Sequence, residues 1–301
     1  MLYPLKFEPI LVERIWGGNA LARYGKIIPP GQRIGETWEI SDRDDVQSRV
    51  ANGPHKGKTL RQLIDSFGPE TVIGRARPPG APRFPLLVKL LDARETLSVQ
   101  VHPPPAAAGQ LGGEPKTEMW YILEAAPQAK LFAGLRRGVT RAQFEQAPAD
   151  SVHRIPVRPG DAIFIPSGRV HAVGAGLVLV EIQQNSDTTY RVYDWGRTGR
   201  QLHLQESLAC INFDDFEPAP TPLPITCEHF TVEKLVLNGE HHDRCDGSTF
   251  HVLGCIAGEI AVGDEVLRVG EFALLPAGLG PYTLMPLAKN TAALKTFLPK
   301  K

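Results

Sequence analysis

The stretch LSVQVH, residues 97–102, decides the fold and the site that this sequence predicts. Its apolar and polar residues alternate with period two, so Ser98, Gln100 and His102 fall together on one face of a β-strand. An ordinary half-buried strand would turn that polar face to water. Here a proline-rich stop, PPPAAAG, follows the histidine and leads to a second strand-like run, KTEMWYIL. The polar face is therefore a candidate for a binding site.

Two later segments add side chains of the same chemical kind. The run KTEMWYIL places Glu118 on one strand face with bulky apolar neighbours, where a carboxylate is costly unless it is paired or bound to a cation. The segment GRVHAVG supplies His171 just after a Pro-x-Gly turn. Two imidazoles, a carboxylate and an amide oxygen suit Zn²⁺ or another divalent first-row metal. The predicted set is Gln100, His102, Glu118 and His171. We expect a β-barrel whose lumen holds this one metal.

Composition favours a β-rich protein whose main partner is neither nucleic acid nor an anionic membrane. The 301 residues suffice for one large or two ordinary domains, and 42% hydrophobic residues can form a buried core. Gly 29 and Pro 27 separate short apolar runs at a spacing typical of sandwiches and barrels. The 33 basic residues balance the 33 acidic ones, which argues against nucleic acid or an anionic membrane as a partner. An anionic substrate would need a local basic cluster.

The cysteines and the N-terminus predict a cytoplasmic, soluble protein. The 4 cysteines include no CxxC pair and occur in the last third of the chain, as expected of reduced thiols rather than of a zinc ribbon or a disulfide scaffold. The first residues, MLYPLKFEPILVERIW, carry charges where a signal peptide would need an apolar centre. No apolar run approaches the length of a membrane span.

Three charged residues lie in segments that we expect to form strands. Glu36 and Glu39 lie in a predicted strand around WEIS, and we expect them on a solvated strand face rather than in a site. Lys89 lies inside the apolar run FPLLVKLLDA. Such a lysine lies either at the edge of a sheet or in a site that holds an anion, and the sequence leaves both readings open.

A small helical insertion is predicted at about residues 55–75. The tripeptide GKT at 57–59 matches the end of a phosphate-binding P-loop, but Asn52 occupies the position of its first glycine and no clear strand precedes it. The following segment has apolar residues at helical spacing, with Thr59 as an N-cap and Gly68 as a stop. We therefore expect an amphipathic helix packed on the barrel.

An internal repeat divides the chain. The segment RPGDAIFIPSGRVH, beginning at Arg158, aligns with RVGEFALLPAGLGP, beginning at Arg268. The repeat predicts two domains of similar build, joined near the proline-rich run FEPAPTPLPIT at 216–226. We place the domains at residues 1–220 and 221–301.

The second copy of the repeat lacks metal-binding residues. His171 corresponds to Pro281, and aligning WYIL with FHVL places Glu118 opposite Ser248. Two histidines and a cysteine at 241–245 are flanked by NGE and DGS, and fit an exposed hairpin loop better than a metal site. A single metal site is therefore expected in the first half.

The motifs resemble those of a known family. The segment from Gly160 to His171 resembles the second cupin motif, although Ala175 replaces the asparagine that often closes it. The first cupin motif is only partly kept, because a long insertion separates His102 from Glu118. That insertion, together with LLVKLLDARETLSVQVHP, EPKTEMWYIL and NSDTTYRVYDWGR, is similar to type I mannose-6-phosphate isomerases in their short bacterial form. The resemblance runs from ERIWGG through Arg197 and, more weakly, through the second half.

The resemblance implies a mainly β fold and a zinc enzyme. The fold would be two cupin (jelly-roll barrel) domains with the helical insertion in the N-terminal half. Residues 1–220 would form the catalytic domain and residues 221–301 a cupin domain without metal ligands. One zinc ion per chain would be bound by Gln100, His102, Glu118 and His171.

The same resemblance implies the reaction and the catalytic residues. Arg191 matches an arginine with a catalytic role, Glu181 matches a carboxylate of the same pocket, and the polar lining residues would be Lys89, Lys116 and Asp187. The reaction would be the reversible interconversion of mannose 6-phosphate and fructose 6-phosphate, which needs a base near C1 and C2 and stabilisation of an enediol-like intermediate. Candidates for the base are Glu181, a lysine with lowered pKa, Asp187 and a metal-bound water.

Other readings and questions remain open from the sequence. Two histidines and a carboxylate also form the facial triad of non-haem iron oxygenases, and a cupin can bind sugar without catalysis. The residues that bind the phosphate could be Arg or Lys of the N-terminal region or of GRTGR at 196–200. The sequence does not give the oligomeric state.

Overall fold

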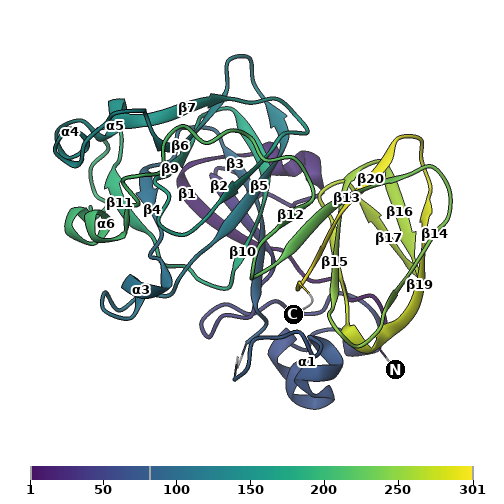
Figure 1. Cartoon of the computed structure of the whole chain (residues 1–301). Helices are drawn as coiled ribbons and strands as arrows, with labels where there is room; N and C mark the ends of the chain where they lie inside the picture. Colours follow the sequence, from purple (N-terminus) through teal and green to yellow (C-terminus); the bar gives the residue numbers. More distant parts are fainter. Residues whose placement is uncertain (1, 81–82, 300–301) are drawn as a thin grey trace.

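The structure is a computed structural model that describes residues 2–80 and 83–299, and most of its regular elements are strands (Figure 1). The strands of the first half are β1 Ile10–Gly18, β2 Ile34–Ile40, β3 Leu86–Ala93, β4 Val99–Val101, β5 Glu118–Ala125, β6 Lys130–Leu135, β7 Val152–Pro156, β8 Ala162–Ile165, β9 His171–Val173, β10 Leu177–Gln184 and β11 Tyr190–Tyr193. Those of the second half are β12 Ile225–Thr226, β13 Thr231–Leu237, β14 His241–Cys245, β15 His251–Ala257, β16 Glu259–Val262, β17 Glu265–Arg268, β18 Phe272–Leu275, β19 Gly280–Pro286 and β20 Thr291–Phe297.

The helices are short. The α-helices are α1 Leu60–Phe67, α2 Pro69–Val72, α3 Pro105–Ala108, α4 Arg141–Gln146, α5 Pro148–Ser151 and α6 Leu204–Cys210. The 3-10 helices are η1 Ala20–Tyr24, η2 Gly53–His55 and η3 Ala277–Leu279. None of the helices within the described residues is both long and apolar enough to cross a membrane.

The strands form four sheets, two from each half of the chain. In the first half, a six-stranded sheet has the order β1-β2-β3-β10-β5-β8 and a five-stranded sheet has the order β11-β4-β9-β6-β7. In the second half, the orders are β12-β13-β20-β15-β18 and β14-β19-β16-β17. Each order runs from one edge strand to another, so over the described residues the sheets are open, and the prediction of a closed barrel is wrong. The prediction of a mainly β fold is confirmed.

The sheets are stacked, and the six-stranded sheet is covered on both faces. Residues of one face, such as Trp120 and Leu179, pack against Leu131 of the five-stranded sheet. The outer face of that five-stranded sheet is covered in turn, because Val99 and Val101 of β4 pack with side chains of α4 and α6. The polar residues between and beside these two valines must then point to the inner face, as the alternation of LSVQVH predicted.

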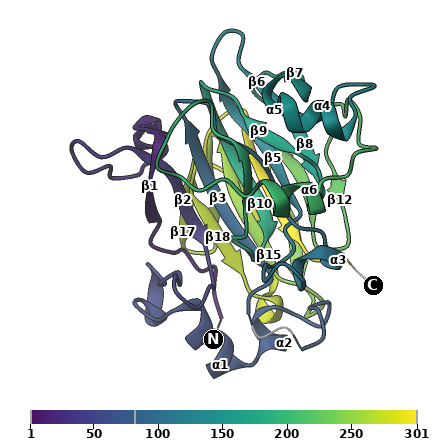
Figure 2. The same ribbon diagram turned by 90° about the vertical axis from the view of Figure 1, so that its left-hand side faces the viewer.

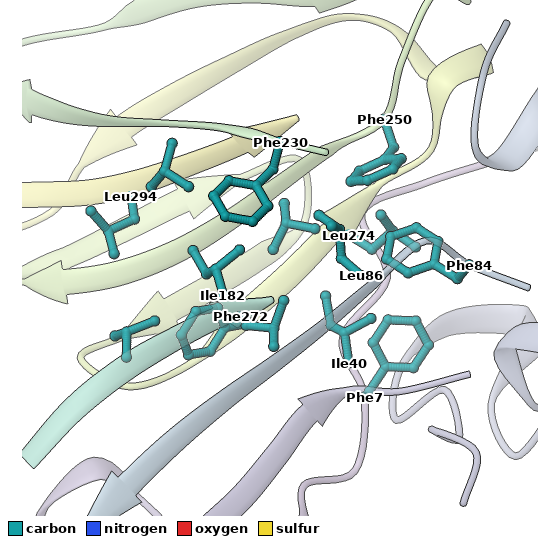
Figure 3. Close-up of a cluster of buried hydrophobic side chains, with 14 of the residues drawn as sticks. Phe7, Ile40, Phe84, Leu86, Ile182, Phe230, Phe250, Phe272, Leu274 and Leu294 are labelled. Atoms are coloured by element: carbon teal, nitrogen blue, oxygen red, sulfur yellow. The ribbon is translucent and has the colours of Figure 1, made fainter. Parts of the chain in front are cut away.

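The two halves share the largest apolar core. The opposite face of the six-stranded sheet contributes Leu86 and Ile182, which pack in one cluster with Phe230, Phe250 and Leu294 of the second half (Figure 3). Figures 1 and 2 show the two sandwiches side by side, with the second half behind the six-stranded sheet. The six-stranded sheet is therefore the common wall of both halves.

The helical insertion forms as predicted. Helix α1 begins after Thr59, whose hydroxyl accepts a hydrogen bond from the Gln62 amide, while the Gln62 side chain accepts one from the Thr59 amide. This reciprocal capping box satisfies amides that the first turn leaves without partners. The helix ends at Gly68, and its apolar face lies in the shared core, where Leu60 and Leu63 are fully buried.

The internal repeat has a counterpart in strand order. Strand β5 lies between β10 and β8, and β15 lies between β20 and β18 in the same antiparallel sense. The aligned segments WYIL and FHVL therefore correspond in the structure, the first within β5 and the second from the residue before β15 into that strand. The aligned turns also correspond, because Gly160 and Gly270 both have positive φ angles, of 95° and 85°.

The shared core predicts that the two halves unfold together. Phe250 of the second half is fully buried, and its ring lies 4.5 Å from that of Phe84 in the first half. Replacing Phe250 with Ala should lower the free energy of unfolding by ~3–5 kcal/mol, because a large buried side chain leaves a cavity. All 4 tryptophans precede residue 200, so their fluorescence reports on the first half. The denaturation midpoint followed by tryptophan fluorescence should fall together with the midpoint followed by circular dichroism.

Val236→Ala is the matched control, because Val236 is also in the second half but is 60% exposed. It should leave both midpoints nearly unchanged. A Phe250→Ala protein that shifts the circular dichroism signal but not the tryptophan signal would contradict a shared core.

Candidate metal centre and active site

Short strands bring the predicted ligands together from three parts of the chain. Gln100 of β4 pairs directly with His171, the first residue of β9. His102 follows β4, and its carbonyl accepts a hydrogen bond of 2.9 Å from the amide of Gly168, whose φ of 87° favours glycine. Glu118 is the first residue of β5 in the facing sheet. The turn that contains Gly168 thus ties the two histidine segments together.

The two histidines and the glutamate form a compact buried cluster. Ligand atoms of His102, Glu118 and His171 all lie within 4.8 Å of one another, and the three side chains are buried. The Nε2 atoms of His102 and His171 lie 3.3 and 3.5 Å from the two carboxylate oxygens of Glu118. The structure therefore contains a potential metal site made of three of the four predicted residues.

Backbone carbonyls orient both imidazole rings. Nδ1 of His102 lies 2.9 Å from the carbonyl oxygen of Thr188, and Nδ1 of His171 lies 2.9 Å from that of Arg169. A carbonyl only accepts, so each Nδ1 carries the proton and each Nε2 presents a lone pair to the cluster. Such an outer hydrogen bond is typical of metal-binding histidines. Nε2 of His102 is buried without a hydrogen-bond partner among the described residues.

The charge state of the cluster also fits a cation. Burial, together with the charge of Lys116, lowers the pKa of His102 to about 4, and burial lowers the pKa of His171. Burial alone would raise the pKa of Glu118, but the charge of Lys116 holds it well below its usual value. Two neutral imidazoles and a carboxylate are therefore present at neutral pH, which is the donor set of many zinc sites.

Gln100 lies next to this cluster but presents its amide nitrogen. Its Nε2 lies 3.3 Å from Nε2 of His171, and its oxygen accepts a hydrogen bond of 3.2 Å from Ser98. The two ends of an amide exchange places by a half-turn of its terminal torsion. The side chain is thus placed so that its oxygen could complete a set of four donors.

A cavity of about 320 Å³ opens beside the cluster. The predicted active-site residues Lys89, Lys116, Glu181, Asp187 and Arg191 all line it. The remaining lining residues are Arg14, Trp16, Glu36, Leu91, Leu97, Ser98, Gln100, Thr189 and Arg200. Gln100 and Lys116 connect the cavity to the buried cluster, because each contacts one of its members.

A chain of alternating charges forms the cavity floor. Nζ of Lys89 lies 3.0 Å from Oε1 of Glu181 and 3.5 Å from Oε2 of Glu36. Nζ of Lys116 lies 2.9 Å from Oε2 of Glu118 and 3.9 Å from Oε1 of Glu181. Four of these residues line the cavity and are each less than 10% exposed, namely Glu36, Lys89, Lys116 and Glu181. Such charges tolerate burial only because each has a partner of opposite sign.

Lys89 lies in the site and not at a sheet edge. Strand β3 is an inner strand between β2 and β10, and Lys89 is paired with Trp38 and Glu181 in register. Burial would lower the pKa of Lys89, but Glu181 and Glu36 raise it above its usual value. Lys89 is therefore a cation at neutral pH and cannot be the lysine with lowered pKa that could act as a base.

The expectation of a solvated face for Glu36 and Glu39 is wrong. Strand β2 is fully buried, because the six-stranded sheet is covered on both faces. Glu36 lines the cavity and accepts a hydrogen bond from Arg14, and Lys89 and Arg14 outweigh burial to lower its pKa to about 2. Glu39 instead pairs with Lys26 at 2.7 Å, which also donates to the carbonyl of Gly270 in the second half.

Arg191 and Asp187 lie toward the open part of the cavity. Arg191 pairs in register with Gln100 and donates a hydrogen bond of 2.8 Å to the carbonyl of Gln201, while its Nε atom is buried without a partner among the described residues. Asp187 is exposed. Sequence reasoning missed Arg14 and Glu36 as lining residues. The available signal was ERIWGG and WEIS, two segments whose strands β1 and β2 pair with each other.

Comparisons with known proteins agree with this geometry. The family model for phosphomannose isomerase type I, catalytic domain, matches residues 5–118. Mannose-6-phosphate isomerase ManA of Bacillus subtilis (strain 168) is 37% identical over 314 residues, which cover 93% of this chain and 95% of that protein.

Solved structures show the same fold. The crystal structure of the mannose 6-phosphate isomerase from Bacillus subtilis has a TM-score of 0.85 at 31% identity, covering 98% of this chain and 99% of that one. A mannose 6-phosphate isomerase bound with zinc and yttrium has a TM-score of 0.78 at 18% identity, covering 99% of this chain and 100% of that one. The match to curated relatives extends over nearly the whole sequence, and the chain belongs to the type I phosphomannose isomerase family.

Proposed function

We propose that this chain is a zinc-dependent aldose-ketose isomerase that interconverts D-mannose 6-phosphate and D-fructose 6-phosphate. The observation that carries the proposal is the cluster of His102, Glu118 and His171 beside a cavity lined by basic and acidic side chains. Family membership supports mannose 6-phosphate as a substrate, because a relative at 37% identity is a mannose-6-phosphate isomerase. A cavity of this size is appropriate for one small molecule.

One zinc ion per chain would be held by Nε2 of each histidine, by the Glu118 carboxylate and by the Gln100 amide oxygen after its half-turn. A mannose 6-phosphate isomerase of the same fold is described with zinc bound, which supports this choice of metal. When bound, the ion would supply Lewis acidity toward substrate oxygens. Lys116 contacts Glu118 at 2.9 Å and would keep that carboxylate ionised for the metal.

Isomerisation needs a proton to move between C2 and C1 of the open-chain sugar through an enediol. We assign this proton transfer to Glu181. Its Oε2 accepts a hydrogen bond of 3.1 Å from the Trp120 indole, which fixes the carboxylate. Its Oε1 forms an ion pair with Nζ of Lys89 at 3.0 Å and has no hydrogen-bond partner among the described residues. Asp187 is more exposed and is the alternative base.

The cations of the cavity would stabilise the enediol. The guanidinium of Arg191 keeps its proton throughout, so it can donate to a developing oxyanion without taking part in proton transfer. Lys89 is also held as a cation and lies beside Glu181, where its charge would favour negative charge on both the base and the intermediate.

The remaining parts of the proposal concern the chain as a whole. The two halves would be cupin domains, residues 1–220 with the metal site and residues 221–301 without it, because the order of β10-β5-β8 recurs in β20-β15-β18. The four cysteines are free, which agrees with a reducing, cytoplasmic location.

The first test is a coupled assay for fructose 6-phosphate formation from mannose 6-phosphate. We expect activity that a chelator abolishes and zinc restores, and turnover that does not depend on oxygen. His102→Ala or His171→Ala should lose both bound zinc and activity, since each removes one of few donors. Zinc content is measured on the purified proteins.

His242→Ala is the matched control, because the His242 side chain is 73% exposed and belongs to the second half. It should keep zinc and activity. Full zinc content in both His102→Ala and His171→Ala would refute the metal assignment even if the activity is as proposed.

Arg191→Ala should keep zinc and lower kcat by ~10²–10³-fold, as expected when one donor to a developing oxyanion is lost. Arg191→Lys should recover only part of the rate, because an ammonium lacks the planar fork of a guanidinium. An unchanged kcat in the alanine variant would remove Arg191 from the mechanism.

Glu181→Gln should keep zinc and lower kcat by ~10²–10⁴-fold, the usual contribution of a general base. Exchange of the substrate C2 proton with solvent deuterium, followed by NMR, should be lost in parallel. Asp187→Asn is the comparison variant and should retain most of the exchange. The reverse ranking of the two variants would assign the base to Asp187.

A further inference from the structure

The outer part of the cavity carries more positive charge than the proposed chemistry uses. Five basic and three acidic side chains line the cavity. The buried lysines have acidic partners, since Lys89 contacts Glu36 and Glu181 and Lys116 contacts Glu118. The excess therefore belongs to the arginines of the cavity, all of which are more exposed than the lysines. They are Arg14, Arg191 and Arg200.

Arg14 is held at its inner end and free at its outer end. Its Nε donates a hydrogen bond of 2.8 Å to Oε1 of Glu36, which fixes the plane of the guanidinium. Within the part of the chain that the structure describes, its two terminal nitrogens have no hydrogen bond. The side chain is 33% exposed and lines the cavity, so these two nitrogens are available to a ligand bound there.

Arg200 is oriented by a shared carboxylate. Its Nε donates to Asp194 at 2.8 Å, and its Nη2 makes a second, short bond to the same group. Asp194 also accepts a hydrogen bond of 2.7 Å from Arg197. One carboxylate between two guanidiniums leaves a net positive charge. It also holds Arg200 in place, so that little side-chain entropy would be lost on binding an anion.

We propose that Arg14 and Arg200 form the binding site for the phosphate group of the substrate. The inference rests on the proposed function and extends it to substrate recognition. Planar guanidiniums match the geometry of phosphate oxygens, and two of them oppose the charge of a phosphate monoester dianion. Arg191 lies close to both arginines, and burial together with the charges of Arg200 and Arg14 lowers its pKa. A bound dianion would relieve this repulsion.

The placement divides the cavity into two ends. At the buried end, Gln100 and Lys116 contact the proposed metal ligands His171 and Glu118. At the other end, the side chains of Arg14 and Arg200 are partly exposed. A hexose 6-phosphate carries its reacting carbons and its phosphate at opposite ends. It would therefore reach both sites at once, and the arginines would select phosphorylated over free sugars.

The test is calorimetric binding of inorganic phosphate to the zinc-loaded protein, alongside the coupled assay. Arg14→Gln and Arg200→Gln should each weaken phosphate binding by ~10-fold or more, the loss expected for a charge-assisted bond. In the assay, each should raise KM for mannose 6-phosphate by a similar factor with a smaller change in kcat. Zinc content should stay at the wild-type value.

Arg33→Gln is the matched control, because Arg33 carries the same charge, contacts Glu95 at the surface and does not line the cavity. It should bind phosphate like the wild type, which separates a local site from the overall charge. Wild-type affinity for phosphate in both the Arg14 and Arg200 variants, or no phosphate binding by the unaltered protein, would overturn the proposal.

The two proposals can fail separately. Isomerase activity with an unchanged KM in both variants refutes the phosphate site and leaves the function intact. Absence of isomerase activity, with phosphate binding that the two substitutions abolish, refutes the function and leaves an anion site that serves another phosphorylated ligand.

Discussion

The pairing of opposite charges along the inner face of the six-stranded sheet is the interaction on which the site depends. Glu36, Lys89, Glu181 and Lys116 are all buried, and none could be ionised there alone without a large desolvation cost. Each contacts a neighbour of opposite sign within 4 Å, and the row ends at Glu118 of the potential metal site. The positions of the reactive groups are thus fixed mutually, so a change in one affects the charge balance of the next.

The stacking of the sheets makes this pairing possible. Because the six-stranded sheet has apolar contacts on both faces, its inward-facing charges are removed from bulk water without being left in an apolar core. Val99 and Val101 of β4 pack against side chains of α4 and α6 on the outer face of the five-stranded sheet. Gln100 and His102 therefore point to its inner face. The apolar residues of the strand therefore determine where its polar residues point.

Part of this arrangement could be predicted from the sequence. Alternation in LSVQVH gave the inward face of β4, helix caps gave α1, and the repeat gave the matching strands β5 and β15. The convergence of His102, Glu118 and His171 followed from their chemistry and from the family motifs. Their role as ligands, and the roles of the cavity residues, stay predictions.

The predictions that were wrong or incomplete share one physical reason. A period of two shows that a strand has two different faces, but it does not show whether the polar face meets water, a cavity or another sheet. For this reason the alternation predicted a solvated face for Glu36 and left the position of Lys89 open. The burial of both residues depends on strands that are distant in sequence. Closure of a barrel is likewise decided by which edge strands pair, and the pattern of one strand does not specify its neighbours.

The apolar wall shared by the two halves has a consequence for how the molecule can be divided. A fragment without the second half would expose the apolar face that carries Leu86 and Ile182, and exposed contiguous apolar patches promote association. Such a fragment would associate with copies of itself. The second half thus behaves as a covalently tethered subunit, whose apolar face covers that of the first half.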